Sequence, residues 1–114
     1  MFKIIGWCSL LVIIIFPLKV EAYQATVMAY SELDSCHFPN CIMSSGKRAY
    51  IGAVACPRKY KLGTKVNIGG KDYFCEDRTA KRYDGRFDIF FGWGKEGHQK
   101  AIQFGKQTLE VIIK

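Results

Sequence analysis

The amino-acid sequence predicts a mainly β protein, a small six-stranded barrel with one short helix. Beyond an apolar N-terminal segment, the chain consists of short extended segments divided by turn residues. One stretch alone, Lys95–Phe104, has apolar residues at helical spacing, and Gly105 follows it as a stop. The 114 residues contain no repeat or low-complexity linker, and their number suits a single domain.

The N-terminal segment has the pattern of a secretory signal peptide. Lys3 precedes Ile4–Leu18, which has no charged residue, and Val20 and Ala22 stand at the third-last and last positions before the expected cleavage. We therefore expect residues 1–22 to be a removable signal. The alternative is a retained anchor, but a membrane span needs about 20 apolar residues. A proline and a lysine shorten this run.

Residues 23–114 carry an excess of basic side chains. Removing residues 1–22 takes away two lysines and one glutamate, so the formal net charge falls from +7 to +6. In an exported protein this charge points to anionic envelope material and away from nucleic acid. Simple solubility would account for it as well. We expect a secreted or periplasmic monomer, with no stable membrane span after cleavage.

Six strands are expected in this part of the chain: Thr26–Tyr30, Tyr50–Cys56, Lys65–Ile68, Lys71–Cys75, Arg86–Phe91 and Thr108–Ile113. The pair Gly69-Gly70 forms a two-residue turn, which predicts a hairpin between the third and fourth strands. The fifth strand turns Phe87 and Ile89 to one face and Asp88 and Phe90 to the other. Because both faces carry large apolar side chains, this strand is expected to be central.

Four cysteines remain after the signal is removed, and their even number in an oxidising compartment predicts two disulfides: Cys36, Cys41, Cys56 and Cys75. Three connectivities are open. The stretch Ser31–Lys47, which holds two of the cysteines, is expected to be a stapled loop. A zinc site is the alternative, but no Cys-x2-Cys pair is present. We expect no metal, no thiol nucleophile, and packing or surface roles for His37 and His98.

The candidate chemistry lies in two acidic segments, Glu76–Thr79 and Arg86–Asp88. Asp77 and Asp88 stand at the ends of two strands, so they can lie close in space. Partial desolvation of Asp88 by neighbouring apolar residues would raise its pKa and suit it to protonating a glycosidic oxygen.

A structural role is the alternative for each carboxyl group in these segments. Asp77 can cap a turn through Thr79, and Asp88 can pair with Arg86. Asp84, which precedes Gly85, is expected to form a turn and not to act as a catalyst.

Four segments resemble the 3D domain, which is named for three aspartates: Gly52–Arg58, Leu62–Val66, Glu76–Thr79 and Gly85–Gly92. This domain is the double-psi β-barrel of MltA-type lytic transglycosylases and of small exported cell-wall proteins. The resemblance covers residues 25–113, because Phe104–Lys106 and Val111–Ile113 match the family's closing glycine-bearing helix and last barrel strand.

The resemblance implies cleavage of peptidoglycan between N-acetylmuramic acid and N-acetylglucosamine, without water and without a cofactor. The product would carry an anhydro-muramic end. Asp88 matches the catalytic acid, and Asp77 matches the second active-site aspartate. One carboxyl suffices, because it can protonate the leaving oxygen and then deprotonate the sugar's own 6-hydroxyl.

The departures from the family also predict structure. Cys56 stands where the third aspartate usually follows the Val-Ala pair, and Cys75 precedes Glu76. A disulfide between neighbouring strands therefore replaces a polar interaction, which pairs Cys56 with Cys75 and leaves Cys36 with Cys41. The second large domain of the MltA-type enzymes has no counterpart here, so a glycan is expected to lie on an open surface.

Side chains around the acidic segments are candidates for substrate contact: Thr79, Lys81, Arg82, Tyr83, Arg86 and Trp93. Tyr83 can stack on a sugar ring, and the basic residues can meet carboxylates of the stem peptide. Trp93 can be a sugar platform or a barrel cap. The leading hypothesis is a peptidoglycan-cleaving enzyme in wall turnover. The alternatives are a noncatalytic wall-binding or wall-loosening barrel and an envelope-toxic secreted protein.

Overall fold

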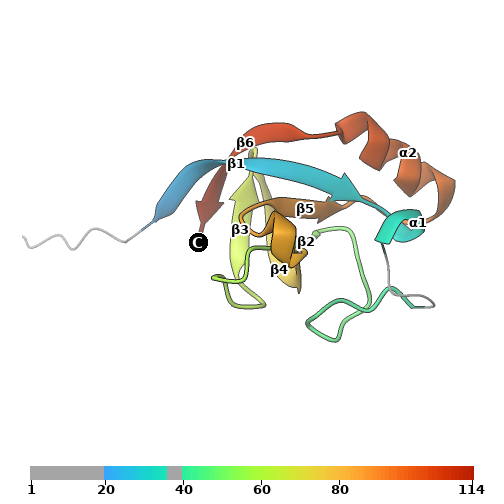
Figure 1. The fold of residues 1–114 in the computed structure, drawn as a ribbon, viewed down its shortest axis with the longest axis horizontal. Helices are drawn as coiled ribbons and strands as arrows, with labels where there is room; N and C mark the ends of the chain where they lie inside the picture. The colour runs from blue at the N-terminus through green and yellow to red at the C-terminus, as the bar shows by residue number, and fades with distance from the viewer. Residues whose placement is uncertain (1–19, 36–39) are drawn as a thin grey trace, which may run out of the picture.

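The computed structural model describes residues 20–35 and 40–114, which form a closed six-stranded barrel (Figure 1). The strands are β1 (Glu21–Tyr30), β2 (Ala53–Cys56), β3 (Lys65–Ile68), β4 (Lys71–Arg78), β5 (Phe87–Phe90) and β6 (Gln107–Ile113). Their order around the barrel is β1-β5-β2-β4-β3-β6. The pairs β1/β5 and β2/β4 are parallel and the other neighbours antiparallel. The mainly β class and the barrel are therefore confirmed.

The barrel interior is filled by side chains from every strand, among them Val27, Val54, Val66, Phe87 and Val111. The predicted hairpin is also present: β3 and β4 pair in antiparallel register around Gly69 and Gly70, whose φ angles of 58° and 95° require glycine.

The disulfide predicted between neighbouring strands is present inside the barrel. Cys56 on β2 and Cys75 on β4 are bonded, with 5.6 Å between their Cα atoms, and neither is exposed to solvent. The parallel pairing of β2 with β4 brings the two residues together. The predicted pairing of Cys36 with Cys41 involves a residue outside the described part of the chain, so it stays a prediction.

Strand β1 is longer than the predicted Thr26–Tyr30, because its first half pairs with β6. The register joins Glu21 to Ile113 and continues along both strands. The Glu21 carboxylate also accepts hydrogen bonds from Lys59 Nζ at 3.0 Å and Tyr60 Oη at 2.9 Å. The predicted signal peptide lies mostly outside the described residues, and the first two residues of β1, Glu21 and Ala22, fall within it.

The predicted helix is confirmed as α2 (Gly94–Phe104), which ends at Gly105 with φ 65°. A one-turn helix, α1 (Glu32–Ser35), lies in the stretch predicted to be loop. The Ser31 backbone N–H and hydroxyl both donate to the Asp34 carboxylate at 2.8 Å. This capping arrangement stabilises a turn too short to leave a periodic apolar pattern. Figure 1 shows α1 beside α2, where β1 ends.

A second, outer core covers part of the barrel's outside. Tyr30, Ala53 and Phe90 face outward from three neighbouring strands and pack under Met43 and Ala49 of the loop between α1 and β2. Strand β5 is thus buried on both faces, as its sequence predicted. The loop leaves the adjoining row of outward side chains uncovered, and this row forms the candidate site.

Gly97 sits where α2 touches the chain leaving β5. A Cβ atom at this position would lie 2.5 Å from the carbonyl oxygen of Gly92 and overlap its backbone. We expect Gly97→Ala to lower the free energy of unfolding by about 1 to 3 kcal/mol, through overpacking.

Urea unfolding measures this change. The control compares Gln99→Ala with Gln99→Gly, because Gln99 is exposed. At such an open helix position, the Ala variant should be about 1 kcal/mol more stable than the Gly variant. The contact is contradicted if Ala is the more stable residue at both positions.

Candidate active site

Four side chains from four neighbouring strands form one row on the outside of the barrel. Met28 on β1 pairs with Asp88 on β5, Asp88 with Ala55 on β2, and Ala55 with Asp77 on β4. Residues paired in register point to the same face of a sheet. Since neighbouring strands lie about 4.8 Å apart, the backbones of the two aspartates are about 10 Å apart. The small Ala55 side chain leaves space between them.

A β-bulge brings Asp77 into this row. Val54 pairs with Cys75 and Ala55 pairs with Asp77, so Glu76 is the extra residue on β4. Cys75 points into the barrel, and strict alternation would turn Asp77 inward as well. The extra residue reverses the alternation, as bulges beside functional sites commonly do. Both predicted catalytic residues therefore share one face.

The Asp77 carboxyl group is fixed by three hydrogen-bond donors. Its Oδ1 atom accepts from the Ser44 backbone N–H at 3.1 Å, the Ser44 hydroxyl at 2.8 Å and the Arg78 backbone N–H at 2.9 Å. Ser44 belongs to the loop that covers the outer core. Sequence reasoning missed Ser44, because no local pattern links it to a residue 33 positions away.

Asp88 lies in a drier environment that is also unfavourable for negative charge. Burial, and then the carboxylates of Asp34 and Asp77, raise its pKa from 3.8 to about 6. The predicted structural alternative, a pair with Arg86, has no support among the described contacts. Arg86 instead contacts Met28 Sδ at 3.7 Å and lies against the Tyr83 ring. Asp88 is thus a carboxyl group that can hold a proton near neutral pH.

The two aspartates line one cleft of about 520 Å³. Its walls come from β1, β2, β4 and β5 and from the segment between β4 and β5. Six of the predicted site residues line it: Asp77, Thr79, Arg82, Tyr83, Arg86 and Asp88. The cleft lies on the outside of the barrel.

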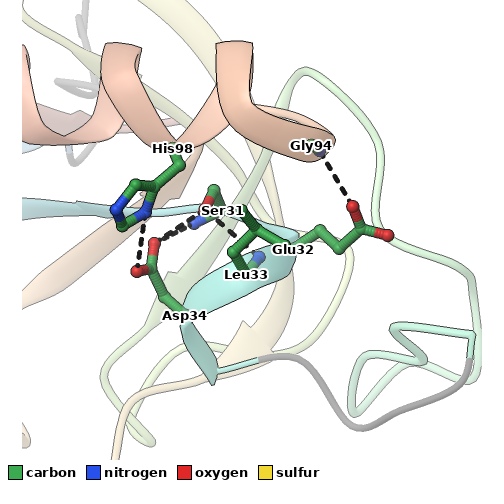
Figure 2. Close-up of polar contacts among 6 residues, drawn as sticks. All are labelled: Ser31, Glu32, Leu33, Asp34, Gly94 and His98. Carbon is green, nitrogen blue, oxygen red and sulfur yellow. Dashed lines mark hydrogen bonds and ion pairs between the residues drawn. The ribbon is translucent and has the colours of Figure 1, made fainter.

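Helix α1 supplies the third carboxylate near Asp88. Figure 2 shows Asp34 between Ser31 and His98, with His98 Nδ1 at 3.2 Å from Asp34 Oδ1. Glu32 also ties α1 to α2, because its carboxylate accepts from the Gly94 backbone N–H at 2.8 Å. His98 therefore has the helix-packing role predicted for it. Asp34 was not predicted from the sequence, because its helix was not.

Glu76 clamps the covering loop to the barrel. It is 3% exposed, and its carboxylate accepts from the Tyr50 hydroxyl at 2.5 Å and from Lys47 Nζ at 3.2 Å. Burial alone would raise the pKa of Glu76, but these hydrogen bonds outweigh it and lower the pKa. Glu76 thus anchors the loop that carries Ser44.

The basic and aromatic candidates lie at two separate places. Tyr83, in the short 3-10 helix η2 (Lys81–Tyr83), is 41% exposed and has the Arg82 and Arg86 guanidinium groups 4.8 and 4.9 Å from its ring. Lys81 is exposed and does not line the cleft. Trp93 belongs to the outer core, where it packs on Phe90 and under the Arg48 guanidinium. Trp93 therefore has the position of a barrel cap.

Tyr30 is a cleft residue that sequence reasoning missed. It ends β1, pairs in register with Phe90 and is 6% exposed, and its hydroxyl has no hydrogen-bond partner among the described residues. Burial, and then the charges of Asp77 and Asp88, raise the pKa of its hydroxyl. Tyr30 is thus a neutral hydrogen-bond donor beside both carboxyl groups.

Within residues 20–35 and 40–114, no group of three or more His, Cys, Asp or Glu side chains is placed to hold a metal ion. In the same part of the chain, no helix is both long and apolar enough to cross a membrane. Neither models of known protein families nor curated proteins match the sequence.

We expect Asp88→Asn to change stability in a pH-dependent way. The folded-state pKa of Asp88 is raised. Its contribution to the stability of the wild type is therefore fully present below about pH 4 and is lost as the pH rises through about 6. The difference between a pKa of 3.8 and one of about 6 corresponds to about 3 kcal/mol of unfolding free energy. Relative to wild type, Asp88→Asn should therefore gain about 3 kcal/mol in unfolding free energy between pH 3.5 and pH 8.

Urea unfolding at both pH values measures this gain, and Asp72→Asn is the matched control. The hydrogen bond from Asn67 lowers the pKa of Asp72 first of all, helped by Lys114 and Lys65. Its substitution should therefore shift relative stability in the opposite direction. The same sign for both variants would refute the assignment of a raised pKa to Asp88.

Proposed function

We propose that this chain is an exported enzyme that cleaves the glycosidic bonds of peptidoglycan in the manner of a lytic transglycosylase, in cell-wall turnover. The observation that carries the proposal is the pair of carboxyl groups in one open cleft. The pKa of Asp88 is raised to about 6 by burial and by two neighbouring carboxylates, while Asp77 is fixed by three donors. Carboxyl groups in contrasting environments are typical of acid–base sites.

Features of the fold support the finer assignment to a double-psi barrel of the 3D type. Six strands close with two parallel pairs, and Asp77 and Asp88 come from β4 and β5, which both neighbour β2. The Cys56–Cys75 disulfide, at the position where the family would have its third aspartate, fits the same assignment. It is also compatible with an extracellular or periplasmic location.

The proposed reaction uses the Asp88 carboxyl group twice, first as acid and then as base. The protonated carboxyl gives its proton to the glycosidic oxygen as the bond from the muramic C1 to that oxygen breaks. The carboxylate then takes the proton of the muramic 6-hydroxyl, whose oxygen bonds to C1. The products are an anhydro-muramic end and a free 4-hydroxyl, and Asp88 is again protonated. The Asp77 carboxylate favours the positive charge that develops at C1.

The wall of the cleft nearest Tyr83 suits a glycan that carries peptides. The exposed Tyr83 ring offers an apolar face for a sugar. The guanidinium groups of Arg82 and Arg86 flank that ring, and such groups bind carboxylates strongly. We propose that they meet the stem-peptide carboxylates, with Lys81 adding charge at longer range. Thr79 lines the floor of the cleft.

The test is release of soluble products from purified peptidoglycan by the oxidised full chain, analysed by mass spectrometry. Wild type should release anhydro-muropeptides, and Asp88→Asn should release at least about 100-fold less, the usual effect of losing a general acid. Asp72→Asn, an exposed carboxyl on β4 outside the cleft, is the control and should behave as wild type.

Two other outcomes would change the assignment. Products with reducing ends would mean hydrolysis, with water in place of the 6-hydroxyl. If nothing is released while the protein still co-sediments with the wall, catalysis is refuted and the chain is a noncatalytic wall-binding barrel.

A further inference from the structure

The described residues include several unpaired polar atoms along the cleft. Among these residues, buried side-chain atoms without a hydrogen-bond partner are Tyr30 Oη, Thr79 Oγ1, Asp88 Oδ1 and His98 Nδ1. The histidine nitrogen lies 3.2 Å from the Asp34 carboxylate, and His98 does not line the cleft. The other three all belong to residues that line the same cleft. Buried polar atoms are normally paired, and each exception requires an explanation.

Two of the three residues are neighbours on the barrel surface. Tyr30 ends β1, two positions beyond Met28, which pairs with Asp88 on the neighbouring β5. Thr79 follows β4, on the other side of the row that contains Asp88, Ala55 and Asp77. Tyr30 is 6% exposed and Thr79 is 7% exposed, so packing holds both side chains. The backbone of Thr79 is also fixed, because its N–H donates to the Cys56 carbonyl oxygen at 3.4 Å. These positions are therefore held by the fold.

The donor of Tyr30 and the acceptor of Asp88 match a hydroxyl group. Tyr30 offers an O–H donor, and ionised Asp88 offers an acceptor. A ligand hydroxyl can accept from Tyr30 and donate to Asp88 at the same time. A carbonyl group, which only accepts, would leave the Asp88 carboxylate unpaired.

We propose that Tyr30 and Asp88 form a subsite that binds one sugar hydroxyl of the glycan. This proposal rests on the proposed function, in which Asp88 takes a proton from the muramic 6-hydroxyl. Tyr30 keeps its own proton and donates a hydrogen bond to the 6-oxygen while that oxygen transfers its proton to Asp88 and bonds to C1. No oxidant, reductant or water enters the step.

The test compares Tyr30→Phe with wild type in the full, oxidised chain. The substitution removes one unpaired hydroxyl and keeps most of the side-chain volume. In the free protein, we therefore expect the urea midpoint to stay the same or to rise. With a soluble tetrasaccharide of alternating N-acetylglucosamine and N-acetylmuramic acid as the probe, kcat/KM should fall about tenfold for Tyr30→Phe.

Two further tyrosine variants serve as controls. Tyr73→Phe removes a hydroxyl outside the cleft lining and should leave both stability and turnover unchanged. Tyr50→Phe removes the hydroxyl that donates to buried Glu76, so its urea midpoint should fall. Together they separate the loss of a ligand contact from the loss of a structural hydrogen bond.

Each remaining outcome decides the proposal. If wild type binds the tetrasaccharide without cleaving it, and Tyr30→Phe binds about tenfold more weakly, the lytic function fails while the hydroxyl subsite stands. The subsite is overturned if Tyr30→Phe binds and turns over the tetrasaccharide like wild type. It is also overturned if Tyr30→Phe unfolds at lower urea, or if wild type does not bind the tetrasaccharide.

Discussion

The candidate site depends on the one-residue bulge in the parallel pairing of β2 with β4. Cys75 faces inward to bond Cys56, so the next outward position would be Glu76, followed by an inward Asp77. An inward carboxylate among Val54, Val66 and Phe87 would have no compensating charge. With the bulge, Glu76 turns to the covering loop and Asp77 joins Asp88 across Ala55. The register of β2 with β4 thus positions both the disulfide and the site.

The same row of residues holds carboxyl groups close together despite their mutual repulsion. Three carboxylates, from α1, β4 and β5, approach one another closely enough to raise the pKa of Asp88, and Tyr30 and Thr79 bury unpaired hydroxyls beside them. Each of these features lowers stability. The outer core and the disulfide offset this cost from neighbouring positions. Such local conflicts, supported by the surrounding structure, are expected at functional sites and not in a purely structural surface.

The covering loop and the helical pair hold the site from opposite sides. Ser44 fixes Asp77, while Tyr50 and Lys47 anchor the loop to Glu76. On the other side, Glu32 and Asp34 connect α1 to Gly94 and His98 of α2 (Figure 2). Positions that appear peripheral in the sequence therefore set the charge and orientation of the two carboxyl groups.

Local patterns were sufficient for the hairpin at Gly69-Gly70, the central strand around Ile89, and α2 with its stop at Gly105, because periodicity and turn chemistry act over a few residues. They also singled out Asp77 and Asp88. Tyr30, Asp34 and Ser44 joined the site only through the tertiary structure, because barrel closure brings β1, α1 and a distant loop to the same row. The bulge had one sequence signal, two adjacent acids after an inward cysteine, but only strand pairing decides which acid faces the cleft.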